Sequence, residues 1–240
     1  MARLGVPPGW LGRDDLLASR PTLDAVMDVA TSGYDTDRLD ILATRFVEIW
    51  TWLIATPAAA SVLLARRLPD VSAANLAVHP GLWADPAPVA LRAPRFWCLP
   101  ADPAAGHPDA TVVADDAALA LALNATLRER HLAPLIETVA GFSLRGRRAL
   151  WRSATDQLVG AFVRAGEATG NAEEGCRLAR LAAAGDPPMH GQARIDRHGG
   201  QPVHVRDGCC LYYRLPDGPH CLNCPLLDAD ERARRLAAGA

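Results

Sequence analysis

The sequence contains no lysine, so all 25 of its basic residues are arginine. They are offset by 27 acidic residues, which leaves a formal net charge of -2 at neutral pH. Proteins that neutralise a phosphate backbone carry an excess of positive charge, gathered on one face or stripe. We therefore expect no nucleic-acid partner for this chain.

The sequence also lacks a secretory signal in its first residues. Pro7, Pro8 and a pair of acidic residues interrupt residues 1–17, where a signal peptide needs a continuous apolar stretch. We therefore expect a protein that stays in the cytoplasm.

Long uncharged runs are missing as well. The longest lies between Glu48 and Arg66 and is shorter than the ~20 residues that a membrane-spanning helix needs. Pro57 divides this run, and proline is disfavoured inside a helix, so we expect a buried helical hairpin here. Trp50 and Trp52 lie within the run, which leaves peripheral contact with the inner face of the membrane open.

Nucleotide-binding and hydrolytic motifs are the last notable absence. No Gly-x-Gly-x-x-Gly pattern joins a strand to a helix, so neither nicotinamide nor flavin can be assigned to this chain. We find no catalytic triad and no paired-carboxylate motif. Any redox activity would therefore need electrons from a separate protein.

Hydrophobic residues make up 50% of the 240-residue chain, enough for one large core. Two short runs at residues 88–93 and 95–100 are typical of strands, and Gly199 and Gly200 predict the turn of a β-hairpin over residues 192–205. Helical periodicity predicts helices over residues 22–30, 37–55, 57–68, 115–132, 143–170 and 172–184, with another beginning at Pro134. The predicted fold is therefore mainly α with a small β element (α+β).

We predict two parts in the chain. Residues 1–190 would form a helical body with a proline-rich insertion at about 69–110. Residues 191–240 would form a C-terminal segment that contains the hairpin and most of the cysteines.

Four of the six cysteines lie close together, in the stretch DGCCLYYRLPDGPHCLNCPL. Cytosolic reductants keep thiols reduced, so metal ligation explains such a group better than disulfides do. Cys98 and Cys176 have no partner at metal-ligand spacing, and we expect them to be buried apolar residues. The candidate metal ligands are Cys209, Cys210, Cys221 and Cys224.

Four thiolates suit either zinc or an iron-sulfur cluster. Cys221 and Cys224 have the spacing of a zinc knuckle, whereas the adjacent Cys209 and Cys210 would close a strained ring on a single ion. A two-iron cluster divides its thiolates between two irons, so adjacent cysteines fit it more easily. The residues alone leave both metals open.

The stretch CCLYYRLPDGPHCLNCPL closely resembles the C-terminal iron-sulfur motif of the FhuF-like ferric siderophore reductases. The vicinal pair, both spacings of the C-C-x10-C-x2-C pattern and the intervening Tyr-Arg-x-Pro occur together. Upstream, HLAPLIETVAGFSLRGRRALW resembles a helical portion of these reductases and of related siderophore-synthetase domains. The resemblance implies a [2Fe-2S] cluster held by Cys209, Cys210, Cys221 and Cys224.

The resemblance also implies an oxidoreductase that transfers one electron to a ferric siderophore, of hydroxamate type, and releases Fe(II). A ferredoxin, a flavodoxin or a reductase would be its electron donor. Two other interpretations remain: a non-redox siderophore-binding or scaffold protein with a structural zinc site made by the same cysteines, and an iron-sulfur sensor.

Several residues near the cysteines invite a functional hypothesis beside a purely structural one. Arg214, His204 and His220 could place charge or hydrogen-bond donors near the sulfur atoms and tune a cluster. His131 could be a helix cap or could contact a siderophore. Four arginines near the start of a predicted helix could attract an anionic ferric chelate or an acidic electron donor, although such a run is more often a solvated face: Arg145, Arg147, Arg148 and Arg152.

Overall fold

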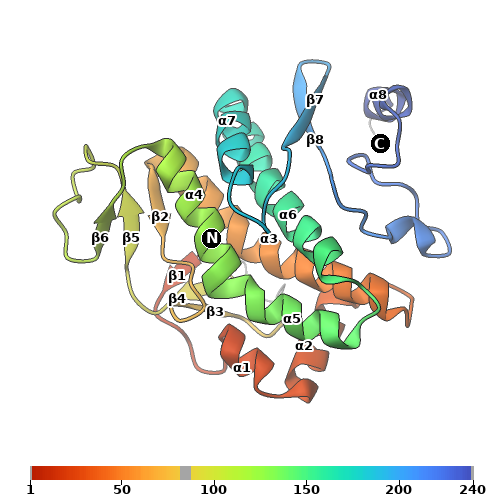
Figure 1. The fold of residues 1–240 in the computed structure, drawn as a ribbon, viewed down its shortest axis with the longest axis horizontal. Coiled ribbons are helices and arrows are strands. Elements are labelled where there is room, and N and C mark those ends of the chain that lie inside the picture. The colour runs from red at the N-terminus through yellow and green to blue at the C-terminus, as the bar shows by residue number, and fades with distance from the viewer. Residues whose placement is uncertain (1, 82–87, 239–240) are drawn as a thin grey trace.

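The computed structural model describes residues 2–81 and 88–238 and consists of packed helices flanked by small sheets (Figure 1). The α-helices are α1 (Arg13–Leu17), α2 (Arg20–Thr31), α3 (Leu39–Ala65), α4 (Asp116–Leu127), α5 (Ala133–Phe142), α6 (Arg147–Ala168), α7 (Ala172–Ala183) and α8 (Ala229–Ala237). A π-helical turn, Arg128–Leu132, joins α4 to α5, and a short 3-10 helix covers Tyr212–Arg214. The predicted fold class, mainly α with a small β element, is confirmed.

The strands form three small sheets. Their bounds are β1 (Ala2–Leu4), β2 (Arg67–Pro69), β3 (Leu76–Val78), β4 (Val89–Leu91), β5 (Phe96–Cys98), β6 (Ala110–Val112), β7 (Arg194–His198) and β8 (Gln201–Val205). In the first sheet, β4 pairs parallel with β1 and antiparallel with β3. In the second, β5 pairs antiparallel with β2 and parallel with β6. The runs predicted as strands at residues 88–93 and 95–100 are β4 and β5, and part of the proline-rich insertion, residues 82–87, lies outside the described residues.

The helix α3 runs unbroken through Pro57, so the predicted helical hairpin is wrong. Proline removes one backbone hydrogen bond and costs roughly 3 kcal/mol inside a helix. Ile54 and Val62 on either side of it are fully buried, and burying each such side chain contributes about 1.5–3 kcal/mol. Packing therefore outweighs the cost of the proline. The helix ends at Ala65, and Arg66 takes a left-handed conformation that leads the chain into β2.

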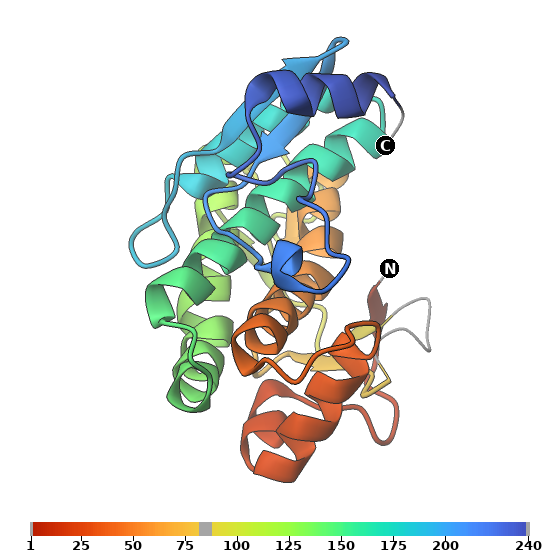
Figure 2. The same ribbon diagram turned by 90° about the vertical axis from the view of Figure 1, so that its right-hand side faces the viewer.

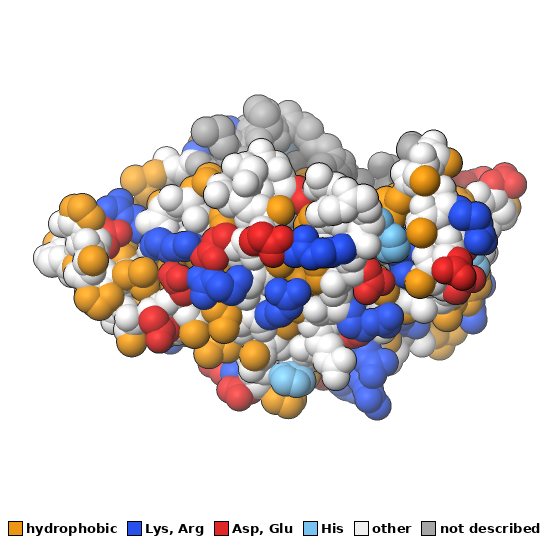
Figure 3. All heavy atoms as spheres, turned by 90° about the horizontal axis from the view of Figure 1, so that it is seen from above, with side chains coloured by type: hydrophobic (Ala, Val, Ile, Leu, Met, Phe, Trp, Pro, Cys, Tyr) orange, Lys and Arg blue, Asp and Glu red, His pale blue; other side chains and the backbone are white. Residues whose placement is uncertain are grey.

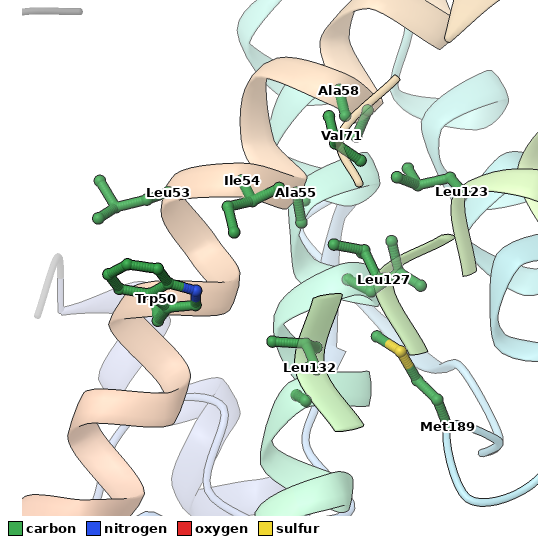
Figure 4. Close-up of a cluster of buried hydrophobic side chains, with 14 of the residues drawn as sticks. Trp50, Leu53, Ile54, Ala55, Ala58, Val71, Leu123, Leu127, Leu132 and Met189 are labelled. Carbon is green, nitrogen blue, oxygen red and sulfur yellow. The ribbon is translucent and has the colours of Figure 1, made fainter. Parts of the chain in front are cut away.

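The core lies between α3 and α6, with α4 and α5 closing one side (Figures 1 and 4). Trp50 is 1% exposed, and its indole Nε1 donates a hydrogen bond to Nε2 of His131 at 2.9 Å. Burial lowers the pKa of His131 to about 3, so this imidazole is neutral and acts as an acceptor. His131 is therefore a core residue, and the siderophore contact considered for it is excluded by its burial.

The apolar character of α3 belongs to this core. Within residues 2–81 and 88–238, α3 is the one helix that is long and apolar enough to cross a membrane by length and composition, and 67% of its most apolar window is buried. Trp50 cannot reach a membrane surface, whereas Trp52 is half-buried. Membrane contact stays a prediction and gains no support from Trp50.

The C-terminal part begins with the predicted hairpin, which is confirmed as β7 and β8. Gly199 and Gly200 turn it with φ angles of 56° and 82°, values that glycine adopts without strain. Strand β8 lies against α6 and α7, and the chain that follows it crosses the face made by α3 and α6 (Figure 2). The proposed division at residue 190 stays a prediction.

Charged side chains cover the face seen from above in a mixed pattern. Figure 3 shows basic and acidic side chains next to one another there. Ion pairs join neighbouring elements: Arg177 of α7 pairs with Asp116 of α4 at 2.5 Å, and Arg66 pairs with Glu174 of α7 at 2.5 Å.

Candidate metal centre

The cysteine segment, residues 206–227, follows β8 and lies over α3 and α6 (Figure 2). Cys210 and Cys224 are buried, whereas Cys209 and Cys221 are partly exposed. Leu211 adopts a left-handed conformation with φ of 63°, which turns the chain directly after the vicinal pair. Its N–H points to Cys209 Sγ at 3.4 Å. The fold thus places two thiols at the partly exposed edge of the segment and two inside.

The structure brings one pair of the predicted ligands into direct contact. The Sγ atoms of Cys210 and Cys221 are 3.6 Å apart. Two thiolates on one tetrahedral ion, each about 2.3 Å from the metal, stand about 3.8 Å apart. The spacing of this pair is therefore that of two ligands sharing one ion. Among the described residues, no group of three or more His, Cys, Asp or Glu side chains is gathered closely enough to hold an ion.

The four thiols are coupled electrostatically. Burial raises the pKa of Cys209, and the charges of Cys210 and Cys224 raise it further. The hydrogen bond from Cys221 lowers the pKa of Cys210 to about 6, and the nearby Arg206 also favours its thiolate. The same contact raises the pKa of Cys221, since one proton is shared between the two sulfurs. A thiolate thus forms first at Cys210.

The backbone just before Cys209 is fixed by Asp156 of α6. Its buried carboxylate accepts hydrogen bonds from the N–H groups of Asp207 at 2.9 Å and Gly208 at 2.8 Å. A Cβ atom at Gly208 would stand 3.0 Å from Asp156 Oδ2, tighter than ordinary contacts. Glycine at this position therefore allows the segment to approach α6 closely.

A buried ion network connects the segment to both central helices. The guanidinium of Arg206 pairs with Glu48 of α3 and lies 3.6 Å from Asp156. Arg206, Glu48 and Asp156 are each at most 4% exposed. Burial alone would lower the pKa of Arg206, but the charge and hydrogen bond of Glu48, together with the charges of Asp156 and Cys210, outweigh it and the pKa is raised. Glu48 also pairs with Arg45, so two cations share its carboxylate.

Two further arginines hold the segment through backbone carbonyls. Arg232 of α8 is 2% exposed and donates to the carbonyl oxygens of Leu222, Cys224 and Leu227, each at 2.8 Å. Arg145 donates to the carbonyl of Cys209 at 2.7 Å. Sequence reasoning missed Arg232 and Glu48, because nothing in the local pattern shows that a distant arginine or glutamate turns toward the cysteines.

The three residues considered for tuning a cluster make their described hydrogen bonds, ion pairs and ring contacts with groups other than the cysteines, and their tuning role stays a hypothesis. Arg214 is exposed, and its Nε points to the hydroxyl of Tyr213 at 3.3 Å. His204 is buried 3.5 Å from Asp156, and the ring of His220 packs near Tyr213 with centroids 5.0 Å apart. None of the three makes a described hydrogen bond to a cysteine sulfur, although the charge of Cys209, after the hydrogen bond to Tyr213, contributes to raising the pKa of Arg214. Cys98 and Cys176 are fully buried, as predicted.

One comparison with known proteins bears on this segment. Residues 206–226 match the model of the FhuF 2Fe-2S C-terminal domain. The match contains all four cysteines in their predicted spacing and confirms the resemblance to the FhuF-like family. No curated protein matches the chain.

The match supports a [2Fe-2S] cluster, and the donor set fits one. Such a cluster takes four thiolates and divides them between two irons. Cys209, Cys210, Cys221 and Cys224 would hold the cluster, and the contact between Cys210 and Cys221 already brings two of these thiols together. The vicinal cysteines then need not chelate the same ion.

Proposed function

We propose that this protein is a cytoplasmic oxidoreductase that transfers one electron to a ferric siderophore, of the hydroxamate type, and thereby releases Fe(II). The observation that carries the proposal is the FhuF 2Fe-2S match over residues 206–226, which includes all four clustered cysteines. In this proposal, the cluster ligands are Cys209, Cys210, Cys221 and Cys224.

The chemistry of the substrate explains why one electron is enough. Hydroxamate oxygens are hard ligands that hold Fe(III) strongly, whereas Fe(II), with its lower charge, binds them weakly and exchanges quickly. A [2Fe-2S] cluster supplies single electrons when bound. The reaction therefore needs no nucleophile or general base, only proximity between the cysteine segment and the bound chelate.

The chain's own residues contribute position and charge. Asp156, Arg145 and Arg232 fix the backbone on both sides of the cysteines. Partial exposure of Cys209 and Cys221 leaves one edge of the segment accessible to an electron donor and to a chelate. The electron itself comes from a separate donor protein, for which a ferredoxin, a flavodoxin or a reductase is our proposal.

Composition analysis tests the metal first. Anaerobically purified protein should contain about two irons and two inorganic sulfides per chain, as a two-iron cluster requires. One zinc ion per chain with neither iron nor sulfide would instead establish the zinc scaffold.

Serine variants test the ligands. Cys221→Ser and Cys224→Ser should each lose or destabilise the visible absorbance of the cluster, because the hydroxyl is a poorer ligand for iron. Cys176→Ala is the matched control, since this thiol is fully buried in α7 and away from the segment. An unchanged visible spectrum in both serine variants would contradict the assignment.

Electron transfer is tested with the reduced protein. Mixed anaerobically with a ferric hydroxamate, it should reoxidise while a ferrous-specific chelator gains colour at the same rate. Reduced protein that is reoxidised by no class of ferric siderophore would contradict the proposed reaction and favour an iron-sulfur sensor.

A further inference from the structure

A cavity of about 710 Å³ opens beside the first half of α6. We call it the α6 cavity; its wall includes Arg147, Arg148, Trp151, Arg152, His190 and Asp207. Its volume lies within the roughly 300–1,000 Å³ that small-molecule sites occupy. Trp151 is only 6% exposed and gives the cavity a rigid apolar wall, and the charged side chains, which we call its rim, complete the lining.

Two cations of this cavity have no partner. Arg148 and Arg152 are exposed and stand one helical turn apart, and among the described residues neither makes a hydrogen bond or an ion pair. Arg147, by contrast, pairs with Glu137 at 2.5 Å. Asp207 is the other acid at the rim, so two unpaired positive charges face one negative charge.

The helix itself adds to the positive potential. Arg147 and Arg148 stand in the first turn of α6, which has no acidic residue and no side-chain cap. The N-terminus of a helix already carries partial positive charge, so cations there are unfavourable unless an anion joins them. The cavity thus combines a concave wall, unpaired guanidinium groups and a positive helix end.

The α6 cavity also lies next to the cysteine segment. Asp207, in its rim, is two residues before Cys209. The stem of Arg152 lies against Gly208, where an added Cβ would stand 3.3 Å from Arg152 Cβ. Consecutive Cα atoms are about 3.8 Å apart, so the rim comes within about 8 Å of the Cα of Cys209. A molecule in this cavity would be close to the site of electron transfer.

We propose that the α6 cavity binds the ferric chelate and selects chelates with a net negative charge. This inference rests on the proposed reaction and defines its substrate by net charge, in place of the hydroxamate type alone. Two classes of chelate share this negative charge: a tris-catecholate, and a hydroxamate chelate that also carries a carboxylate. Arg148 and Arg152 pair with the negative groups of the chelate, and Trp151 contacts its apolar part.

Binding of redox-inert analogues tests the cavity separately from the reaction. We would titrate the oxidised holoprotein by calorimetry with Ga(III) complexes of a tris-catechol siderophore, a carboxylate-bearing hydroxamate and a neutral tris-hydroxamate. The anionic complexes should bind more tightly than the neutral one. The variant Arg148→Gln/Arg152→Gln should bind them about tenfold more weakly for each arginine lost, which is ~1.4 kcal/mol each. Added salt should reduce the difference.

Arg180→Gln serves as the control, because Arg180 is exposed on α7, away from the cavity. Equal affinity of the double variant and the wild type for anionic complexes would overturn the proposal, as would equal affinity of the wild type for anionic and neutral complexes. Arginine-dependent binding without any reduction of the Fe(III) complexes would support the cavity while refuting the proposed reaction. A double variant that binds chelates normally but accepts electrons slowly from its donor protein would assign the cavity to that donor and overturn the proposal.

Discussion

Replacing Arg232 with alanine should loosen the cysteine segment without unfolding the helical core. The guanidinium is 2% exposed and donates three hydrogen bonds, each 2.8 Å long, to the carbonyls of Leu222, Cys224 and Leu227. These three carbonyl groups belong to residues at or near Cys221 and Cys224. In the variant, these three carbonyl oxygens lose the guanidinium that donates hydrogen bonds to them.

The size of the effect follows from those three bonds. A hydrogen bond to a charged group contributes about 1.5–3 kcal/mol, and bonds that share one donor group are not additive. A total of about 3 kcal/mol is a conservative value. Since ~1.4 kcal/mol corresponds to a factor of ten, the equilibrium for opening the segment should shift by roughly a hundredfold.

Cluster release reports this opening. We would follow the visible absorbance of holoprotein in excess iron chelator under anaerobic conditions, and monitor the helical core by far-UV circular dichroism. Arg232→Ala should lose absorbance roughly a hundredfold faster at unchanged helicity. The rate at which Arg232→Lys loses absorbance should lie between those of the wild type and Arg232→Ala, because one ammonium cannot reproduce the planar fork of a guanidinium.

The control lies in the same helix. Arg234 is 67% exposed and pairs with Glu231, so Arg234→Ala should behave like the wild type. If Arg232→Ala releases its iron at the rate of Arg234→Ala, the reasoning about the three carbonyls is refuted.

Three further variants test other contacts. Glu48→Ala leaves the buried guanidinium of Arg206 without its main partner and should lower the free energy of unfolding, measured in urea, by about 3 kcal/mol. The control Glu173→Ala removes an exposed carboxylate and should lower it by less than about 1 kcal/mol. Equal losses in the two variants would contradict this prediction. His131 has a pKa of about 3 when folded but about 6.5 when unfolded, so the unfolded state binds the extra proton and stability should fall as pH drops from about 6.5 to about 3, by at most ~1.4 kcal/mol per pH unit. His131→Gln should flatten this decline in urea titrations, and an unchanged slope would assign it to other groups. Gly218→Ala would put a Cβ 2.0 Å from a backbone carbonyl oxygen and should destabilise the visible chromophore, while Gly141→Ala, with nothing within 4 Å, should not; equally stable chromophores would refute the clash.

Elements with local signals were predictable from the sequence. Asp115 caps α4 through the N–H of Ala118 at 2.8 Å, and two glycines turn the β7–β8 hairpin. The helix α3 was not predictable in the same way. Pro57 signals a break, and only the burial of the surrounding side chains by α6 and by the neighbouring strands explains why the helix continues.

The same distinction applies to the metal centre. The spacing of Cys209 to Cys224 is contained in the sequence, so the ligands could be proposed from it. The groups that hold those ligands come from far along the chain. Glu48 lies 158 residues before Arg206, and no periodicity or motif indicates this pair. Arg214, close to the cysteines in sequence, is instead exposed at the surface.

The distribution of arginine charge around the segment differs from what sequence proximity suggests. The charge of Arg206 is neutralised by Glu48 and by Asp156. Arg145 has no carboxylate partner among the described residues and donates to the carbonyl of Cys209. Arg232 forms an ion pair with Asp196 at 3.5 Å and also donates a hydrogen bond to the carbonyl of Cys224.

Four thiolates gathered in one segment repel one another, so nearby positive charge favours their gathering. Arg206 connects the segment to α3 and α6 through Glu48 and Asp156, and its charge also favours the thiolate of Cys210. Arg145 favours the thiolate of Cys209, and Arg206 favours those of Cys210 and Cys221. Positive charge near the sulfurs favours both thiolate ligation and uptake of an electron. Tuning of the cluster by Arg214 stays a hypothesis, beside the contributions of Arg145 and Arg206.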